Sequence, residues 1–303
     1  MSRRIIELFK FPELLRIPVL SGLNYKWGLR ADNKSILKEK ITSPLNKEPR
    51  DEQVIVSLTS YPVRIPYVHL AIKSLMVQTY KPDRIILWLA EEQFPTRELP
   101  KELTELEKHG LEIIWMHDIY GHKKYFYPVL NQKDNEVVIT FDDDIIYSKN
   151  AIKRLVKTHK KFPNCVVCER GQVYDKRFEE NPGLWKIISS VGVKKPTYSI
   201  NPSPGGGCLI PKGAFYKDAT DEEKIRELAY KNDDLWYMFM CVQNKTPMIK
   251  TRKYHKTFSV IDGSQTEQMA TENVLGNKNA EILEGLKRAY PEAWERIVTD
   301  KEN

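Results

Sequence analysis

The fold is decided by the stretch Val137-Val138-Ile139-Thr140-Phe141-Asp142-Asp143-Asp144-Ile145-Ile146-Tyr147, in which three consecutive aspartates follow an apolar run. Short runs of Val, Ile and Phe are typical of strands that are buried on both faces of a sheet. Adjacent carboxylates repel one another unless an opposite charge lies nearby. The stretch therefore predicts a buried strand with a cation site at its carboxyl end.

Strand-like and helix-like segments alternate before this stretch. Apolar runs predict strands at 53–60, 84–90, 111–116 and 136–141, and helical patterns predict helices at 66–78 and 99–108. This order indicates an α/β fold with a mainly parallel sheet and helices on both faces. Ligands of such sheets bind beyond the carboxyl ends of the strands, which is where the three aspartates are expected.

The composition is that of a globular protein with an anionic partner. With 303 residues, 41% of them hydrophobic, the chain can bury a core. Its net charge of +7 suits nucleic acid, phosphorylated metabolites or an acidic lipid surface. No segment has the roughly 18 to 20 apolar residues of a membrane span, and no signal peptide is recognisable, so we expect a cytoplasmic protein.

Four cysteines are too few and too scattered for a disulfide framework. Cys165 and Cys168 form a CxxC, but no second pair follows to complete a zinc site. The sequence favours buried, reduced thiols on a strand over a structural zinc.

Three segments have two interpretations each. Residues 1–50 mix cations with bulky apolar residues, which fits an arm on the inner membrane surface or one packed on the protein itself. The helix expected at 151–161 carries a basic face that is either solvated or an anion site, formed by Lys153, Arg154, Lys157, Lys160 and Lys161. The glycines at 205–207 allow backbone to approach a ligand or a neighbouring strand closely, although their spacing matches no nucleotide-binding fingerprint.

An acidic pair opens the next helix, in Asn232-Asp233-Asp234-Leu235-Trp236. One interpretation is structural, since Asn or Asp caps a helix and acidic groups in the first turn interact well with its dipole. The other is catalytic, because a carboxylate at the rim of a pocket can remove a proton from an incoming hydroxyl.

Taken together, these motifs resemble the GT-A glycosyltransferases, in particular the bacterial family-2-like enzymes that build capsule and lipopolysaccharide. Residues 74–87 resemble their first helix, "QTY" turn and second strand, Asp142 to Asp144 resemble their DxD motif, and Asp233-Asp234 resemble their acceptor-side acidic pair. The resemblance implies a Rossmann-like catalytic domain at 51–260, with a donor half at 51–150 and an acceptor half at 151–260. A helical segment at 261–303 would form a cap or lid.

The resemblance also implies a nucleotide-diphosphate sugar as donor, expected to be a UDP-sugar, with Mn²⁺ or Mg²⁺. Asp144 would ligate the metal and Asp142 the ribose or a metal-bound water. His255 looks like a late histidine that completes the metal shell, although a histidine among lysines also suits the surface. Asp234 is the expected general base, with Asp233 as second choice, in a reaction that inverts the anomeric configuration.

The remaining donor contacts are less regular. The second strand runs into Glu91 rather than the usual aspartate pair, so Glu91 is a substitute for the carboxylate near the base. Residues 118–125 resemble a "D-x-GxxxKY" stretch, in which Lys123 and Lys124 either neutralise the diphosphate or lie exposed. Further donor contacts are expected from Asp143 and, after the first strand, from Thr59, Tyr61 and Arg64. Four aromatic residues either stack on sugars or belong to the core: Trp185, Tyr198, Trp236 and Tyr237.

Three functions remain open. The first is metal-dependent glycosyl transfer to a glycan or lipid-linked acceptor in surface polysaccharide synthesis, with possible peripheral contact at the inner face of the cell membrane. The second is a metal-dependent nucleotidyltransferase or phosphohydrolase, which also uses paired acids. The third is a basic nucleic-acid-binding protein, although no nucleic-acid motif is present and aspartates at the sheet edge repel phosphate.

Overall fold

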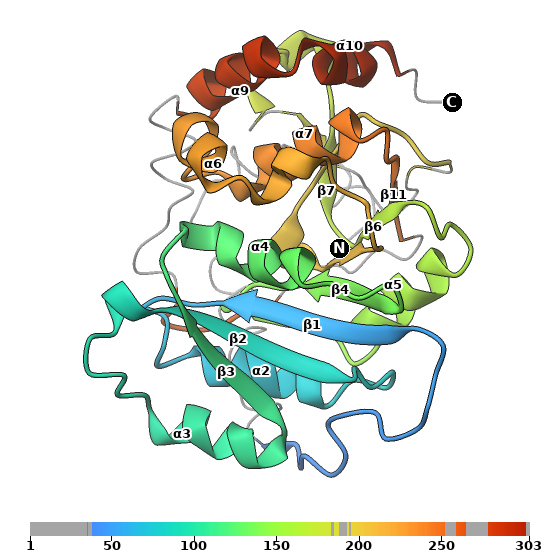
Figure 1. Cartoon of the computed structure of the whole chain (residues 1–303). Helices are drawn as coiled ribbons and strands as arrows, with labels where there is room; N and C mark the ends of the chain where they lie inside the picture. The colour runs from blue at the N-terminus through green and yellow to red at the C-terminus, as the bar shows by residue number, and fades with distance from the viewer. Residues whose placement is uncertain are drawn as a thin grey trace, which may run out of the picture.

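A computed structural model describes residues 35, 38–182, 185–187, 193, 195–251, 259–264 and 278–300. Its centre is a seven-stranded sheet in the order β11-β6-β10-β4-β1-β2-β3, in which β10 alone runs antiparallel to its neighbours (Figure 1). The strands are β1 Gln53–Thr59, β2 Arg84–Ala90, β3 Leu111–Met116, β4 Glu136–Thr140, β6 Val166–Cys168, β10 Cys208–Ile210 and β11 Met248–Lys250. The predicted mainly parallel α/β fold is therefore confirmed.

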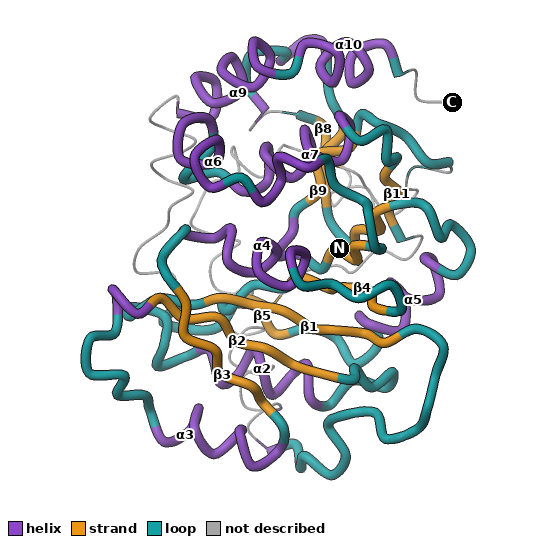
Figure 2. Tube along the Cα trace, in the orientation of Figure 1, coloured by secondary structure: helices purple, strands orange, loops and turns teal. Residues whose placement is uncertain are grey.

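Helices cover both faces of this sheet (Figures 1 and 2). Along β1, Val54, Val56 and Leu58 belong to one core and Ile55 to the other, because successive side chains of a strand point to opposite faces. The first face is covered by α2 Val68–Met76, α3 Lys101–Thr104 and α5 Ala151–His159. The second is covered by α4 Lys123–Leu130 and α7 Asp233–Gln243, on which α6 Glu222–Leu228, α9 Lys278–Ala289 and α10 Pro291–Thr299 assemble.

Two small sheets complete the described part of the chain. The strands β5 Ile145–Ile146 and β12 Ser259–Val260 pair directly after the aspartates. The strands β7 Gly171–Val173, β8 Lys186–Ile187 and β9 Ile200–Pro202 form a three-stranded sheet. The described part of residues 164–210 thus contains five short strands.

Several local predictions can be compared with the structure. The predicted strands match β1 to β4 within one residue at each end. The helix expected at 99–108 is only one α-helical turn followed by the 3₁₀ helix η4 Glu105–His109. The four cysteines are buried, and burial raises the pKa of the Cys165 and Cys168 thiols to about 11 and about 12, as expected for strand thiols.

Part of the predicted N-terminal arm can be described. Near its end, Asn46 and Arg50 both donate hydrogen bonds to Asp83, the first at 2.9 Å and the second, through Nε, at 2.8 Å. Ile41 and Leu45 pack against the core of the first face. Residues 41–50 therefore pack on the domain itself, whereas residues 1–34 lie outside the described part. Among the described helices, none is both long enough and apolar enough to cross a membrane.

Candidate active site

The three aspartates leave the sheet at its carboxyl edge, as the sequence predicts. β4 pairs in parallel with β1, and the Phe141 N–H still donates to the Ser57 carbonyl at 3.0 Å. Beyond Phe141 the strand pairing ends, so the three carboxylates lie where the sheet opens.

The Asp143 side chain points inward and has a positioning role. Ser60 Oγ donates to one carboxylate oxygen at 2.6 Å and Arg64 Nη1 to the other at 2.8 Å. Only 5% of the side chain is exposed, and burial raises the pKa of Asp143 although Arg64 opposes this. Asp143 therefore ties the turn after β4 to the loop after β1.

Arg64 links this buried aspartate to the next one. Its Nη1 lies 3.0 Å from Asp144 Oδ2, and its guanidinium carbon lies 5.5 Å from the centre of the Tyr61 ring. Although burial opposes it, the charges of Asp143 and Asp144 raise the pKa of Arg64. Arg64 and Tyr61, predicted as donor contacts, are thus placed beside the aspartates.

Asp142 is the most open of the three carboxylates, with 36% of its side chain exposed. Its backbone N–H donates to the Tyr147 hydroxyl at 2.8 Å, and that hydroxyl donates to the Gly205 carbonyl at 2.5 Å. A Cβ on Gly205 would lie 1.6 Å from Asp142 Oδ2, so no larger residue fits unless the carboxylate moves. The glycine at 205 therefore permits the close approach that the sequence indicated, and the approach is to a site carboxylate.

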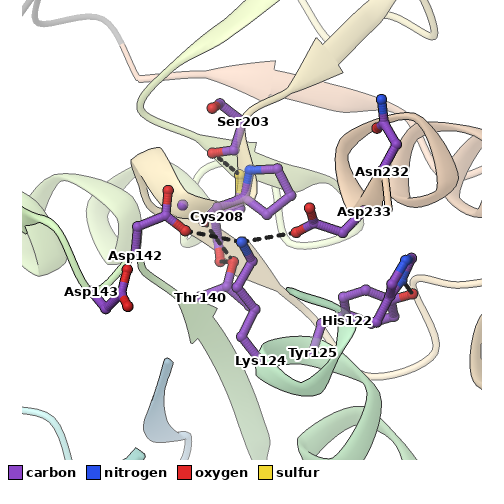
Figure 3. A network of polar contacts seen from close by, with 12 residues as sticks. His122, Lys124, Tyr125, Thr140, Asp142, Asp143, Ser203, Cys208, Asn232 and Asp233 are labelled. Atoms are coloured by element: carbon purple, nitrogen blue, oxygen red, sulfur yellow. Dashed lines mark hydrogen bonds and ion pairs between the residues drawn. The ribbon is translucent and has the colours of Figure 1, made fainter. Parts of the chain in front are cut away.

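Lys124 connects the aspartates to α7. Its Nζ lies 3.0 Å from Asp142 Oδ1 and 2.8 Å from Asp233 Oδ2 (Figure 3). Only 7% of the Lys124 side chain is exposed. Burial alone would lower its pKa, but the charges of Asp142, Asp233 and Asp234 raise it well above the ordinary value. The expected alternative of a surface-exposed lysine is wrong, because Lys124 is a buried cation between two carboxylates.

The acidic pair of α7 lies in the first turn of the helix, as the structural interpretation expects. Asn232 caps the helix, since its Oδ1 accepts a hydrogen bond from the Leu235 N–H at 2.9 Å. Asp233 and Asp234 then begin α7 beside Lys124. Burial favours the neutral form of Asp233, but Lys124 and His122 outweigh it and lower the pKa of this carboxyl. Burial, reinforced by the charge of Asp233, raises the pKa of Asp234 to about 8.

A buried histidine directly before α4 supports this arrangement. His122 Nε2 lies 3.0 Å from the Ala229 carbonyl, to which it donates, and Nδ1 lies 2.6 Å from the Tyr125 hydroxyl, from which it accepts. Burial lowers the pKa of His122 to about 4, so it is neutral at pH 7. It thereby fixes the start of α4, and with it Lys124, against the segment before α7.

Other predicted donor residues lie elsewhere along the sheet edge. Lys123 is buried but forms an ion pair with Asp118, and burial lowers the pKa of the amine. Glu91 is exposed and pairs with Arg97, while Thr59 Oγ1 donates to the Trp88 carbonyl at 2.8 Å. The structure therefore brings none of these three onto the Asp142–Lys124–Asp233 network. His255 lies outside the described residues.

Three of the four aromatic residues are buried in the core, and the fourth packs against it. Trp185, Trp236 and Tyr237 are buried in the core of the second face, so the core interpretation holds for them. Tyr198 is partly exposed, and its hydroxyl donates to the Lys245 carbonyl at 3.2 Å.

Sequence reasoning missed two positioning residues, Ser60 and Tyr147, and indicated a third, Gly205, without its partner. Ser60 carries no pattern that distinguishes it from other loop serines. Tyr147 follows the aspartates by three residues, but its contact with the glycine loop depends on the fold. The glycines at 205–207 indicated that the backbone approaches another group closely at Gly205, but not that this group is the Asp142 carboxylate.

The donor atoms of the site suit a hard divalent cation. Among the described residues, no group of three or more His, Cys, Asp or Glu side chains forms a metal cluster. Mg²⁺, however, is usually held by one or two carboxylates together with substrate phosphates. Asp142 and Asp144 supply two carboxylates from one turn, and they fit this requirement.

Comparison with known families identifies the chain. The glycosyl transferase family 2 matches residues 54–218, which is more than half of the 303 residues and includes the three aspartates but not the α7 pair. A comparison with curated proteins found no match.

Three solved structures are similar at low identity. The mannosyltransferase PcManGT from Pyrobaculum calidifontis, in complex with GDP-Man and Mn²⁺, is 13% identical with a TM-score of 0.46, covering 91% of this chain and 83% of that one. The 4-diphosphocytidyl-2C-methyl-D-erythritol synthase from Anaerococcus prevotii is 12% identical with a TM-score of 0.42, covering 76% and 98%. S. aureus TarS 1–349 is 12% identical with a TM-score of 0.41, covering 68% and 59%. Because the family match spans more than half of its length, the chain belongs to glycosyl transferase family 2 and is a glycosyltransferase.

Proposed function

We propose that this enzyme transfers a sugar from a nucleotide-diphosphate donor, a UDP-sugar in the first instance, to a glycan or lipid-linked acceptor in surface polysaccharide synthesis. Family 2 glycosyltransferases use nucleotide-sugar donors and divalent metals. The observation that supports the proposal is that Lys124 forms two ion pairs. One is with Asp142 on the donor side and the other with Asp233 on the acceptor side, so the two carboxylates are held beside each other. A lipid-linked acceptor would be met at the inner face of the membrane.

Asp142 and Asp144 are the residues that would hold a divalent cation, Mn²⁺ or Mg²⁺. When bound, such an ion neutralises the charge that develops on the diphosphate leaving group. Asp143 contributes indirectly, because its bonds to Ser60 and Arg64 fix the turn that carries the other two carboxylates.

Asp234 is our candidate for the general base. Its carboxylate would accept the proton of the acceptor hydroxyl while the hydroxyl oxygen attacks the anomeric carbon. The bond from that carbon to the phosphate oxygen breaks, and its electron pair leaves with the nucleoside diphosphate. Attack opposite the leaving group inverts the anomeric configuration. A base is most effective when its pKa is near the working pH, and the pKa of Asp234 is raised to about 8.

Asp233 has a different role in this proposal. Its pKa is lowered and its carboxylate is paired with Lys124, so it remains ionised and is a poor proton acceptor. Its charge raises the pKa of Asp234 and holds Lys124 in place.

The test is a panel of nucleotide sugars screened for Mn²⁺-dependent protection against thermal unfolding, followed by transfer assays with the donor that protects. A specific ligand raises apparent stability by mass action. We expect Asp144→Ala to lose the metal-dependent protection, whereas Asp234→Asn keeps it and loses transfer by 100-fold or more, on the order expected for a lost general base.

The products separate this proposal from the alternatives. Release of nucleoside diphosphate with a new glycosidic bond supports it. Pyrophosphate as product, or cleavage of the donor by water alone, would instead establish a nucleotidyltransferase or a phosphohydrolase. Retention of the anomeric configuration, measured by NMR, would remove the Asp234 base from the mechanism.

A further inference from the structure

A charged hollow lies away from the Lys124 network, lined by residues of α5 and of the edge strand β11. Its volume is about 660 Å³. Four cations from α5 and the residues after it line one side, and the β11 segment with Val193 lines the other. The full lining is Asn150, Lys153, Arg154, Lys157, Thr158, Lys161, Phe162, Val193, Ile249, Lys250 and Thr251.

The charge of this hollow is strongly unbalanced. Among the described residues, its lining contains five basic side chains and no carboxylate. Arg154 is neutralised by Glu169, with which it forms two bonds of 2.7 Å and 2.5 Å. No carboxylate in the described part of the chain pairs with Lys153, Lys157 or Lys161.

The three unpaired lysines reinforce one another. Lys153 and Lys157 are four residues apart on α5, which places their side chains about 5–6 Å apart on one helix face, and Lys161 follows shortly after the helix ends. Like charges at this spacing destabilise a helix. The lysine stripe, formed by Lys153, Lys157 and Lys161, therefore weakens the fold unless an anion compensates its charge. Their fields also overlap well within the screening length of about 8 Å at physiological salt.

The walls of the hollow are held rigidly. The Glu169 side chain that anchors Arg154 is only 3% exposed, and Thr251 Oγ1 also donates to it at 3.2 Å. Phe162, Ile249 and Val193 supply apolar surface. Lys161 lies over the Phe162 ring, with its Nζ 5.4 Å from the ring centre. Lys153, Lys157 and Lys161 are themselves exposed at the mouth of this partly apolar hollow, and a hollow lined by several cations suits a discrete anionic group better than a flat surface would.

The hollow is lined by the carboxyl end of β11, so it lies at the same edge of the sheet as the aspartates but several strands away from them. Thr140, Cys208, Cys168 and Lys250 are partners in adjacent strands, in one row across the sheet. Three strand spacings of about 4.8 Å place Lys250 roughly 14 Å from Thr140. The hollow is therefore distinct from the Asp142 site.

We infer that this hollow binds a phosphate-bearing group, independently of sugar transfer. The basic face of α5, for which the sequence left a solvated surface and an anion site open, is then the anion site. The phosphate belongs either to a soluble compound or to a phospholipid headgroup, and the two sources share the same recognition by Lys153, Lys157 and Lys161.

The test compares two triple variants of the full chain with equal loss of charge. Lys153→Gln/Lys157→Gln/Lys161→Gln removes the stripe. Lys101→Gln/Lys108→Gln/Lys160→Gln removes three exposed lysines outside the hollow, one of them next to α5. Binding of inorganic pyrophosphate is measured by calorimetry in metal-free buffer, and binding to vesicles with and without phosphatidylglycerol by sedimentation. Thermal melts check that both variants are folded.

We expect the stripe variant to weaken pyrophosphate binding at least tenfold and the control variant to change it less than twofold. If the protein binds anionic vesicles through the three lysines and pyrophosphate releases it, the source of the phosphate is a lipid headgroup. If pyrophosphate binds through the three lysines but the vesicles do not, the source is a soluble compound. Equal losses in both variants would overturn the inference. So would vesicle binding that pyrophosphate does not displace, or the absence of stripe-dependent binding to either probe.

Discussion

Two neighbouring carboxylates at the start of α7 differ in charge because their surroundings differ. Lys124 and His122 lower the pKa of Asp233, whereas burial and the charge of Asp233 raise the pKa of Asp234 to about 8. Paired acids whose pKa values are pushed apart are a common way to obtain a proton acceptor near neutral pH. The sequence predicted both residues at the site but could not separate their roles. The charge that distinguishes their pKa values comes from Lys124, which is more than 100 residues away in the chain.

The pH dependence of transfer follows from this difference. The groups that face Asp234 are Asp233 on its own helix, Lys124, Asp142 and Arg170. The base form of Asp234 grows as the pH rises through about 8, so kcat/KM should rise with pH and level off above that value. Asp233→Asn removes the nearest negative charge, so the pKa of Asp234 falls and the rise should shift to lower pH by about one unit or more. A pH–rate profile whose rising limb stays in place in this variant would exclude Asp234 as the titrating base.

A second prediction at the residue scale concerns Gly205. Alanine at this position would place its Cβ within the van der Waals radius of the Asp142 carboxylate, which must then move. We expect Gly205→Ala to lower kcat/KM at least tenfold, an effect of about 1.4 kcal/mol or more in transition-state stabilisation.

Gly285→Ala is the matched control. This glycine lies within α9, where an added Cβ meets only Leu228 at an ordinary distance of 3.8 Å. Alanine is favoured over glycine in a helix by about 1 kcal/mol, so the control should be slightly more stable and equally active. Full activity in the Gly205 variant would mean that the position of Asp142 is not critical.

At the scale of elements, the site depends on α4 lying between the sheet and α7. This helix was not predicted, because its short sequence Lys-Lys-Tyr-Phe-Tyr-Pro-Val-Leu combines two adjacent lysines with an internal proline, Pro128. The sequence left two interpretations of the two lysines, diphosphate neutralisation or surface exposure, and both lysines are buried against acidic partners. Tertiary contacts decide the structure of this segment, and they are not visible in local sequence.

Replacing Lys124 tests this arrangement. Lys124→Met keeps most of the length of the side chain but removes the charge that lies between Asp142 and Asp233. Removing one partner of a buried ion pair leaves an uncompensated charge and costs on the order of 3 kcal/mol. We expect chemical denaturation to show a loss of that order in the free energy of unfolding, together with a loss of transfer.

A second substitution distinguishes charge pairing from packing. In Lys124→Met the carboxylates of Asp142 and Asp233 have both lost their ion pair with Lys124. The double variant Lys124→Met/Asp233→Asn removes one of these two negative charges, so part of the lost stability should return. The opposite result is a double variant that is less stable than Lys124→Met by the same amount that Asp233→Asn alone costs in the unmodified protein. That result would show that the ion pair contributes nothing to the free energy of unfolding.

For the whole molecule, the α/β fold and the parallel strands were predictable because β1, β2 and β4 are near-continuous apolar runs, as expected for strands buried on both faces. The short strands from β6 to β10 were not predictable, since three-residue strands carry too little pattern. The aspartates after β4 were placed correctly because the carboxyl edge of a parallel sheet follows from topology alone. Their partners Ser60, Lys124 and Gly205 come from three other parts of the chain, and only the fold brings them together.

The measurement that tests the proposed site most directly is manganese anomalous diffraction from a crystal soaked with Mn²⁺ and the nucleoside diphosphate selected by the donor screen. The account predicts one strong anomalous peak beside the carboxylates of Asp142 and Asp144, with the diphosphate next to it and α7's acidic pair facing the open side. A manganese ion and diphosphate bound away from these two aspartates would contradict it.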